Sequence, residues 1–228
     1  VYKRQLEVGL MEAHFEGVTR AVFERDLAEK RWAILLRTEA DELAGFSTVQ
    51  VLDTVFEGQP HRFLFSGDTI VAPAYWNQPA LAGAFGHLIL RAMAEYGEER
   101  LHWFLITKGY RTYRFLPLNF TSFHPAPGRP APAEAQALLA HVARLKFGAQ
   151  FDAACGVIRA DGTKDRLRPE LCAIPEGRAT DTHVRFFLER NPDYAKGDEL
   201  TCLTDLRRDN LTALGWRQIE RTRPRWVD

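Results

Sequence analysis

A short run of charged and phenolic side chains follows directly on a mainly apolar stretch, residues 101–106. The run contains Lys108, Tyr110, Arg111, Tyr113 and Arg114. Lysine and arginine hold anions, and a phenol with a reference pKa of about 10 keeps its proton at neutral pH and can donate it to a leaving group. These residue types predict a reactive site at the end of a buried strand. The alternatives are a solvated basic helix face and two tyrosines that pack in the core with hydrated hydroxyls.

A single carboxylate, Asp68, interrupts a second apolar stretch, FLFSGDTIV at residues 63–71. A carboxylate flanked by core sequence is costly unless it is paired or used. Asp68 is therefore a candidate general base. The alternative is that Gly67 and Asp68 form an ordinary turn or bulge between two short strands.

The elements that must position these residues follow from hydrophobic periodicity and β-branched content. We predict a helix over about 5–29, strands near 32–37, 43–55, 62–71 and 101–107, a loop at 72–80, and a helix whose inner face carries Phe85 to Tyr96. A short helix is expected after residue 107. His124, at the end of this segment, is a weaker candidate for the site.

The second half of the chain begins with four prolines between His124 and Glu134, which predict a stiff surface loop. Helices are expected at about 133–147 and in THVRFFLERN, and a strand near 199–206. We therefore predict one domain over 1–228, with a proline-rich loop at 124–134 and a mainly helical appendage at about 134–195.

The composition argues against several classes of function. Among the 228 residues, thirty basic and thirty acidic side chains cancel, so neither nucleic acid nor an anionic membrane is an expected partner. No stretch approaches the roughly 18 to 20 apolar residues of a membrane span, and no secretory signal opens the chain. Three widely spaced cysteines predict free thiols in a reducing cytoplasm. No histidine pair has metal-ligand spacing, so no metal is expected, and the P-loop, GxSxG and GxGxxG motifs are absent.

The first 120 residues resemble the GCN5-related N-acyltransferase (GNAT) superfamily. In TIVAPAYWNQPALAGAFGHLILRAM, Val71 and Pro73 stand where the family has Val-x-Pro between a strand and a helix. LHWFLIT corresponds to the family's splayed strand, and LNF at residues 118–120 to its Leu-Gly-Phe. The resemblance implies an α+β fold with a twisted, mostly antiparallel mixed sheet flanked by helices, in an uncharacterised bacterial branch of the superfamily.

The resemblance also implies a function: transfer of an acyl group from a thioester donor to the amine of a small molecule or peptide. Asp68 stands where the family often has an acidic base. The family's tyrosine aligns with Phe115, so Tyr110 or, by preference, Tyr113 would supply the acid. No tightly bound cofactor is implied; acyl-CoA or an acyl-phosphopantetheine is the co-substrate. Candidate donor contacts are Val71, Trp76, Asn77, Gln78, Thr107, Lys108, Arg111 and Arg114.

The loop at 72–80 departs from the family pattern because its phosphate-binding glycines are missing and Pro79 removes a backbone donor. We therefore expect weaker affinity for free CoA than the family norm. Acyl carrier protein, which presents only phosphopantetheine, remains a candidate donor and partner. Two other functions stay open: a non-catalytic module that binds an acyl ligand or a protein, and a synthase that resembles the autoinducer makers.

Overall fold

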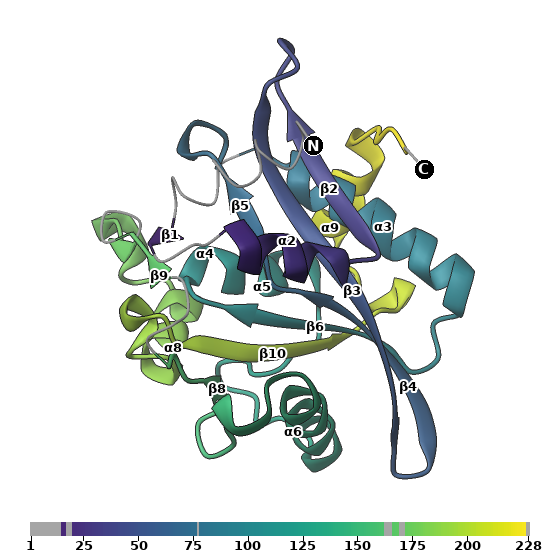
Figure 1. Ribbon diagram of the computed structural model, residues 1–228, viewed down its shortest axis with the longest axis vertical. Helices are drawn as coiled ribbons and strands as arrows, with labels where there is room; N and C mark the ends of the chain where they lie inside the picture. The colour runs from purple at the N-terminus through teal and green to yellow at the C-terminus, as the bar shows by residue number, and fades with distance from the viewer. Residues whose placement is uncertain (1–14, 17–19, 77, 162–165, 169–171, 227–228) are drawn as a thin grey trace.

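A mixed sheet lies at the centre of the computed structural model, which describes residues 15–16, 20–76, 78–161, 166–168 and 172–226 (Figure 1). Its eight strands have the order β2-β3-β4-β6-β10-β8-β7, with β5 beside β3. Only the pairing of β4 with β6 is parallel among those described. The strands are β2 (Trp32–Arg37), β3 (Leu43–Phe56), β4 (Gln59–Ser66), β5 (Thr69–Val71), β6 (Leu101–Thr107), β7 (Phe151–Asp152), β8 (Val157–Ile158) and β10 (Glu199–Asp205).

Helices flank the sheet, and α2 crosses it on the side toward the viewer in Figure 1. The helices are α2 (Arg20–Ala28), α3 (Ala80–Tyr96), α4 (Tyr110–Tyr113), α5 (Phe115–Asn119), α6 (Ala133–Phe147), α8 (Thr182–Arg190) and α9 (Ala213–Arg221). The fold is therefore the predicted α+β class, a mostly antiparallel mixed sheet with helices around it. No helix in the described ranges is both long and apolar enough to cross a membrane.

Two hydrophobic clusters lie on opposite faces of the sheet because side chains alternate along β4 and β6. Leu64 and Trp103 pack with residues of α3, on what we call the α3 face. Phe63 and Phe104 pack with residues of α6, on the α6 face. Each cluster draws residues from both sides of residue 130.

Most predicted bounds agree with the structure, and two predictions are wrong. Phe15 and Glu16, predicted to be helical, form the short strand β1, which pairs with β9 (Arg166–Leu167), and α2 begins only at Arg20. The remainder of the predicted helix before residue 20 lies outside the described residues. The predicted strand at 62–71 is interrupted at residues 67–68.

Helix α9, which the sequence did not predict, packs beside α3 (Figure 1). The two helices approach closely at Gly83 and Gly86. A Cβ added at Gly83 would lie 2.5 Å from the Gln218 carbonyl oxygen, and one added at Gly86 would overlap the Ile219 side chain. These glycines therefore serve helix packing, and they are not displaced phosphate-loop glycines.

Candidate functional site

A bulge separates β4 from β5 and opens a gap in the sheet. Between the Gln50–Phe65 and Ser47–Thr69 pairs, two residues of β3 face three residues of the partner strand. The parallel pairing of β4 with β6 ends at Ser66 and Leu105, and beyond the bulge β5 pairs with β3 alone. The C-terminal end of β6 is therefore separated from β5, and residues of both strands line a wide groove.

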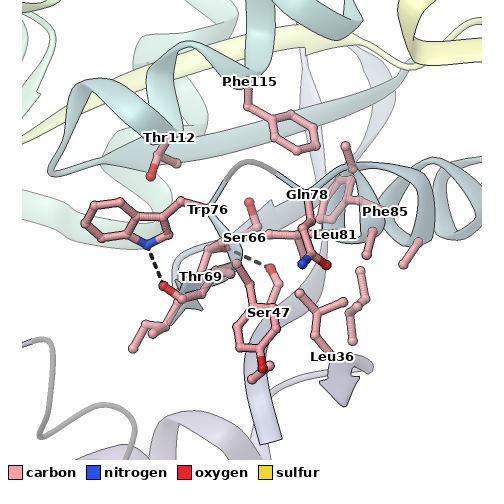
Figure 2. Close-up of a pocket in the computed structure, with 18 of the residues that line it drawn as sticks. Leu36, Ser47, Ser66, Thr69, Trp76, Gln78, Leu81, Phe85, Thr112 and Phe115 are labelled. Carbon is pink, nitrogen blue, oxygen red and sulfur yellow. Dashed lines mark hydrogen bonds between the residues drawn. The ribbon is translucent and has the colours of Figure 1, made fainter. Parts of the chain in front are cut away.

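The α3 side of this groove combines aromatic walls with hydroxyl groups (Figure 2). Phe85, Trp103 and Phe115 form one aromatic group, with ring centroids 4.5 to 6.0 Å apart. The hydroxyls of Ser47 and Thr69 are hydrogen-bonded at 2.8 Å. The combination suits an apolar chain that carries a few polar groups.

The N-terminus of α3 opens onto the same side of the groove. Ala80, Leu81 and Ala82, the first residues of α3, line it, and the first turn of a helix has no intrahelical partners for its N–H groups. Pro79, the N-cap residue, makes no side-chain capping bond. Such an end favours a negatively charged group.

Asp68 lies at the bulge, and its side chain is on the α6 face, opposite the α3 side of the groove. Its Oδ2 accepts a hydrogen bond from Thr48 Oγ1 at 2.8 Å and is 3.5 Å from Lys30 Nζ. The Lys30 ammonium also lies 5.5 Å from the ring centroid of Phe65, a residue of the α6 face. The Asp68 side chain is 21% exposed and lines the groove. The bulge expected as the alternative is therefore present, and it places the carboxylate in the groove.

Burial is the main reason that the pKa of the Asp68 carboxyl is raised to about 6. The Lys30 ammonium acts in the opposite direction, whereas the neighbouring Asp26 carboxylate adds to the rise. Lys30 is shared, because its Nζ is also 2.6 Å from Asp26 Oδ2. A carboxyl with this pKa is ionised at neutral pH and accepts a proton more readily than an ordinary one does.

A second buried carboxylate, Glu199, lines the groove and was missed in the sequence. Its Oε1 is 3.7 Å from Lys108 Nζ, and its side chain is only 5% exposed. Glu199 and Leu203 are four residues apart in β10, so their side chains lie on the same face of the sheet. This is the α6 face, on which Asp68 also lies. The sequence did carry a signal for Glu199, because an acidic residue stands at an inward position of the alternating stretch DELTCLTDL, residues 198–206.

The candidate residues of the 107–114 segment separate into two groups. Lys108, Tyr110, Arg111 and Arg114 line the groove, whereas Thr107 and Tyr113 do not. Arg114 Nε is 3.0 Å from Asp181 Oδ2, at the start of α8. The Thr107 side chain is buried, with its hydroxyl 3.4 Å from the Leu200 carbonyl oxygen.

Tyr113 is a core residue, contrary to the preference for it as the acid. It is 0% exposed, and its hydroxyl donates to the Pro125 carbonyl at 2.9 Å. Its ring packs near Phe186 and Phe187 of α8. Burial raises the pKa of the Tyr113 phenol above its ordinary value, which makes it a weaker proton donor.

The predicted loop contacts lie at the open end of the gap. Val71, Trp76 and Gln78 line the groove, whereas Asn77 lies outside the described residues. Trp76 Nε1 donates to the Val71 carbonyl at 2.6 Å (Figure 2). The Arg111 guanidinium lies 4.0 Å from the Trp76 ring centroid.

Outside the groove, three titratable side chains form a hydrogen-bonded chain across β4, β6 and β10. His102 Nδ1 is 2.7 Å from Asp205 Oδ1, and His102 Nε2 is 2.9 Å from His61 Nδ1. Because an ionised Asp205 only accepts, His102 donates to it and accepts from His61. Burial, and then the neighbouring His102 and Arg100, lower the pKa of His61. No group of three or more potential ligand side chains in the described ranges could hold a metal ion.

The hydrogen-bonded series His61–His102–Asp205 predicts that the protein loses stability in mild acid. The folded-state pKa of His61 is lowered, so the stability that its neutral form contributes is fully present above about pH 6.5, the unfolded-state value, and is lost as the pH falls from there through the lower folded-state pKa. In His61→Gln the glutamine amide can still donate a hydrogen bond to His102, but it does not titrate between pH 5.0 and 7.5. We expect the fall in melting temperature between pH 7.5 and 5.0 to be smaller in this variant. Equal falls in thermal melts of the two proteins would show that His61 does not contribute.

Comparison with known proteins identifies no family. No family model matches the sequence, and no curated protein does. A solved structure of a conserved protein of unknown function from Enterococcus faecalis V583, described as a probable N-acyltransferase, is similar with a TM-score of 0.42 and 14% identity. The match covers 50% of this chain and 29% of that protein, so the chain spans less than a third of its relative's length. A likeness this weak carries no inference about activity.

Proposed function

We propose that this protein is an N-acyltransferase that moves an acyl group from a thioester, acyl-CoA or acyl carrier protein, to an amine. The observation that carries the proposal is the gap between β5 and β6. It opens on one face to the aromatic groove and the α3 N-terminus, and on the other to the Asp68 carboxylate. A donor on the α3 face and an acceptor on the α6 face would then meet in the gap.

In the proposed reaction, Asp68 takes a proton from the acceptor ammonium, and the neutral nitrogen attacks the thioester carbonyl carbon. The carbon–sulfur bond breaks, the leaving thiolate takes up a proton, and the nitrogen loses its second proton to solvent as the amide forms, so the net products are an amide, a free thiol and one proton. Tyr110, which lines the groove, is the candidate donor of the proton that the thiolate takes up. Glu199, whose carboxylate lines the groove on the same face as Asp68, is the candidate contact for a cationic acceptor.

The donor side supports an acyl chain better than it supports a nucleotide. Phe85, Trp103 and Phe115 supply apolar surface, and the α3 N-terminus supplies N–H groups for one anionic group. The loop before α3 contains no glycine, so its backbone cannot approach a pyrophosphate as closely as a glycine loop does. This favours recognition of the phosphopantetheine arm, which acyl-CoA and acyl carrier protein share.

The direct test is to incubate the protein with panels of acyl-CoA and acyl-carrier thioesters and of amines, and to detect free thiol. Thiol release that depends on the amine, with the matching amide found by mass spectrometry, is the expected result. Binding of thioesters without turnover would favour the non-catalytic module instead. The absence of both binding and turnover across the panels would refute the proposal.

Affinity for free CoA is expected to be weak, because Pro79 and the missing glycines leave few close backbone donors for the pyrophosphate. Calorimetry should give tighter binding for an acylated donor than for unacylated CoA. Tight binding of unacylated CoA would show that the loop holds the phosphates in another way.

The two tyrosines provide a matched pair of variants. Tyr110→Phe should lower turnover while donor binding persists, because only a proton donor in the groove is removed. Tyr113→Phe should leave turnover near the wild-type value and cost about 1 kcal/mol of stability, because it removes one buried hydrogen bond. Steady-state kinetics and thermal melts of both variants check this assignment. The reverse pattern would restore Tyr113 as the acid.

A further inference from the structure

The strand edge that faces the gap is unpaired along β5. Thr48 N donates to Asp68 O, Phe46 lies opposite Ile70, and Ala72 N donates to Ala44 O, so residues 68, 70 and 72 direct their backbone groups to β3. By alternation, Thr69 and Val71 direct theirs toward the gap. Among the described residues, these two have no backbone partner across it. Such an edge is a template for an extended chain that carries amides.

One of these edge groups is already occupied by a side chain. The Trp76 indole N–H donates to the Val71 carbonyl at 2.6 Å. It therefore takes the place that the amide N–H of an incoming chain would occupy. Figure 2 shows the indole lying between β5 and Thr112 of α4. Trp76 therefore stands at the end of the edge that a donor would reach.

Arg111 holds the indole from the opposite side of the gap. Its guanidinium lies 4.0 Å from the Trp76 ring centroid and 4.8 Å from that of Tyr110. Arg111 belongs to α4, which follows β6, whereas Trp76 is bonded to the end of β5. The pair, which we call the Trp76–Arg111 clasp, spans the two strands where they have separated. A cation–π contact of this kind contributes modestly to stability.

We propose that the Trp76–Arg111 clasp is a gate that occupies the donor's place at Val71 and must open before the amide arm of a thioester can pair with β5. The inference rests on the proposed function, because it assigns regulation to the same groove. It makes Trp76 a competitor of the donor, whereas the sequence analysis placed Trp76 among the contacts of the donor. The two roles predict opposite effects of substitution.

Trp76→Phe retains an aromatic ring beneath Arg111 but lacks the N–H, so the Val71 carbonyl is released. We expect roughly three- to tenfold tighter binding of acetyl-CoA and S-acetyl-pantetheine, which corresponds to one hydrogen bond that no longer has to be broken. Affinity for 3′-phospho-ADP, which lacks the amide arm, should not change. Arg111→Gln keeps the indole but removes the cation, and should shift acetyl-CoA affinity in the same direction.

The control is Arg62→Gln, which removes a similar cation–π contact, 4.1 Å from the Tyr96 ring centroid, outside the groove. It should leave all three affinities unchanged. Calorimetric titration of the folded wild type and variants decides among the outcomes. Equal affinities in wild type, Trp76→Phe and Arg111→Gln would overturn the gate alone, and weaker binding in Trp76→Phe would make Trp76 a donor contact. If no protein binds either acetylated probe, the proposed function fails and the gate fails with it.

Discussion

Asp68→Asn is expected to lower turnover roughly 10²- to 10⁴-fold, the range typical of losing a positioned general base. Asn keeps the shape of the side chain, and its amide oxygen can still accept the bond from Thr48 Oγ1. Melting temperature at pH 7.5 should not fall, because the folded-state pKa of Asp68 is raised to about 6. A buried acid of this kind opposes folding once the pH exceeds that value, so its removal costs no stability there.

The pH dependence of turnover provides a second readout for Asp68. In the wild type, the rate should fall as the pH drops through about 6, where the base becomes protonated. Asp26→Asn is the matched control, because Asp26 also contacts Lys30 and its carboxylate raises the pKa of Asp68. This variant should keep turnover at pH 8 and move the acidic limb to lower pH. Wild-type turnover in Asp68→Asn would end the assignment, because Asn serves a bulge equally well.

Gly83→Ala is expected to destabilise the protein by roughly 2 to 3 kcal/mol, which corresponds to about 4 to 12 °C in melting temperature for a chain of this size. The added Cβ would lie 2.5 Å from the Gln218 carbonyl oxygen, a backbone atom that cannot move without shifting α9. The helix preference of Ala over Gly recovers less than this cost. Thermal and urea unfolding measure the effect.

Two further variants test the cause. In Gly86→Ala the obstacle is the Ile219 side chain, so Ile219→Ala in the same protein should restore part of the lost stability. Thr222→Ala should restore only part of the stability lost in Gly83→Ala, because it removes the nearest obstacle, Thr222 Oγ1, but leaves the Gln218 carbonyl oxygen 2.5 Å from the added Cβ. Gly177→Ala, where nothing lies within 4 Å of the added Cβ, should be close to neutral. A neutral Gly83→Ala would mean that α3 and α9 are not closely packed.

The sequence predicted the sheet because its signals there are local. β-branched and aromatic residues mark β2, β3 and β6 within short windows, and the turn at Glu57 and Gly58 lies between β3 and β4. Asp68 could also be found locally, because a carboxylate inside an apolar strand is conspicuous in any context. The helix expected across Phe15 and Glu16 failed because their pairing with β9 lies about 150 residues away, beyond any local period.

Which side chains share the groove was decided only by the tertiary structure. Tyr110 and Tyr113 are equivalent in sequence and both are buried, but α4 packs against α8, which places Tyr113 beside Phe186, whereas Tyr110 lines the groove. Glu199 reaches Lys108 because β10 pairs with β6, a register that no local pattern specifies. Most strands of the sheet and the reactive side chains around Asp68 and Tyr110 could be predicted from the sequence alone, since both follow from the preferences of neighbouring residues. The site itself depends on long-range strand pairing and on a one-residue bulge, which rotates side chains from one face of the sheet to the other.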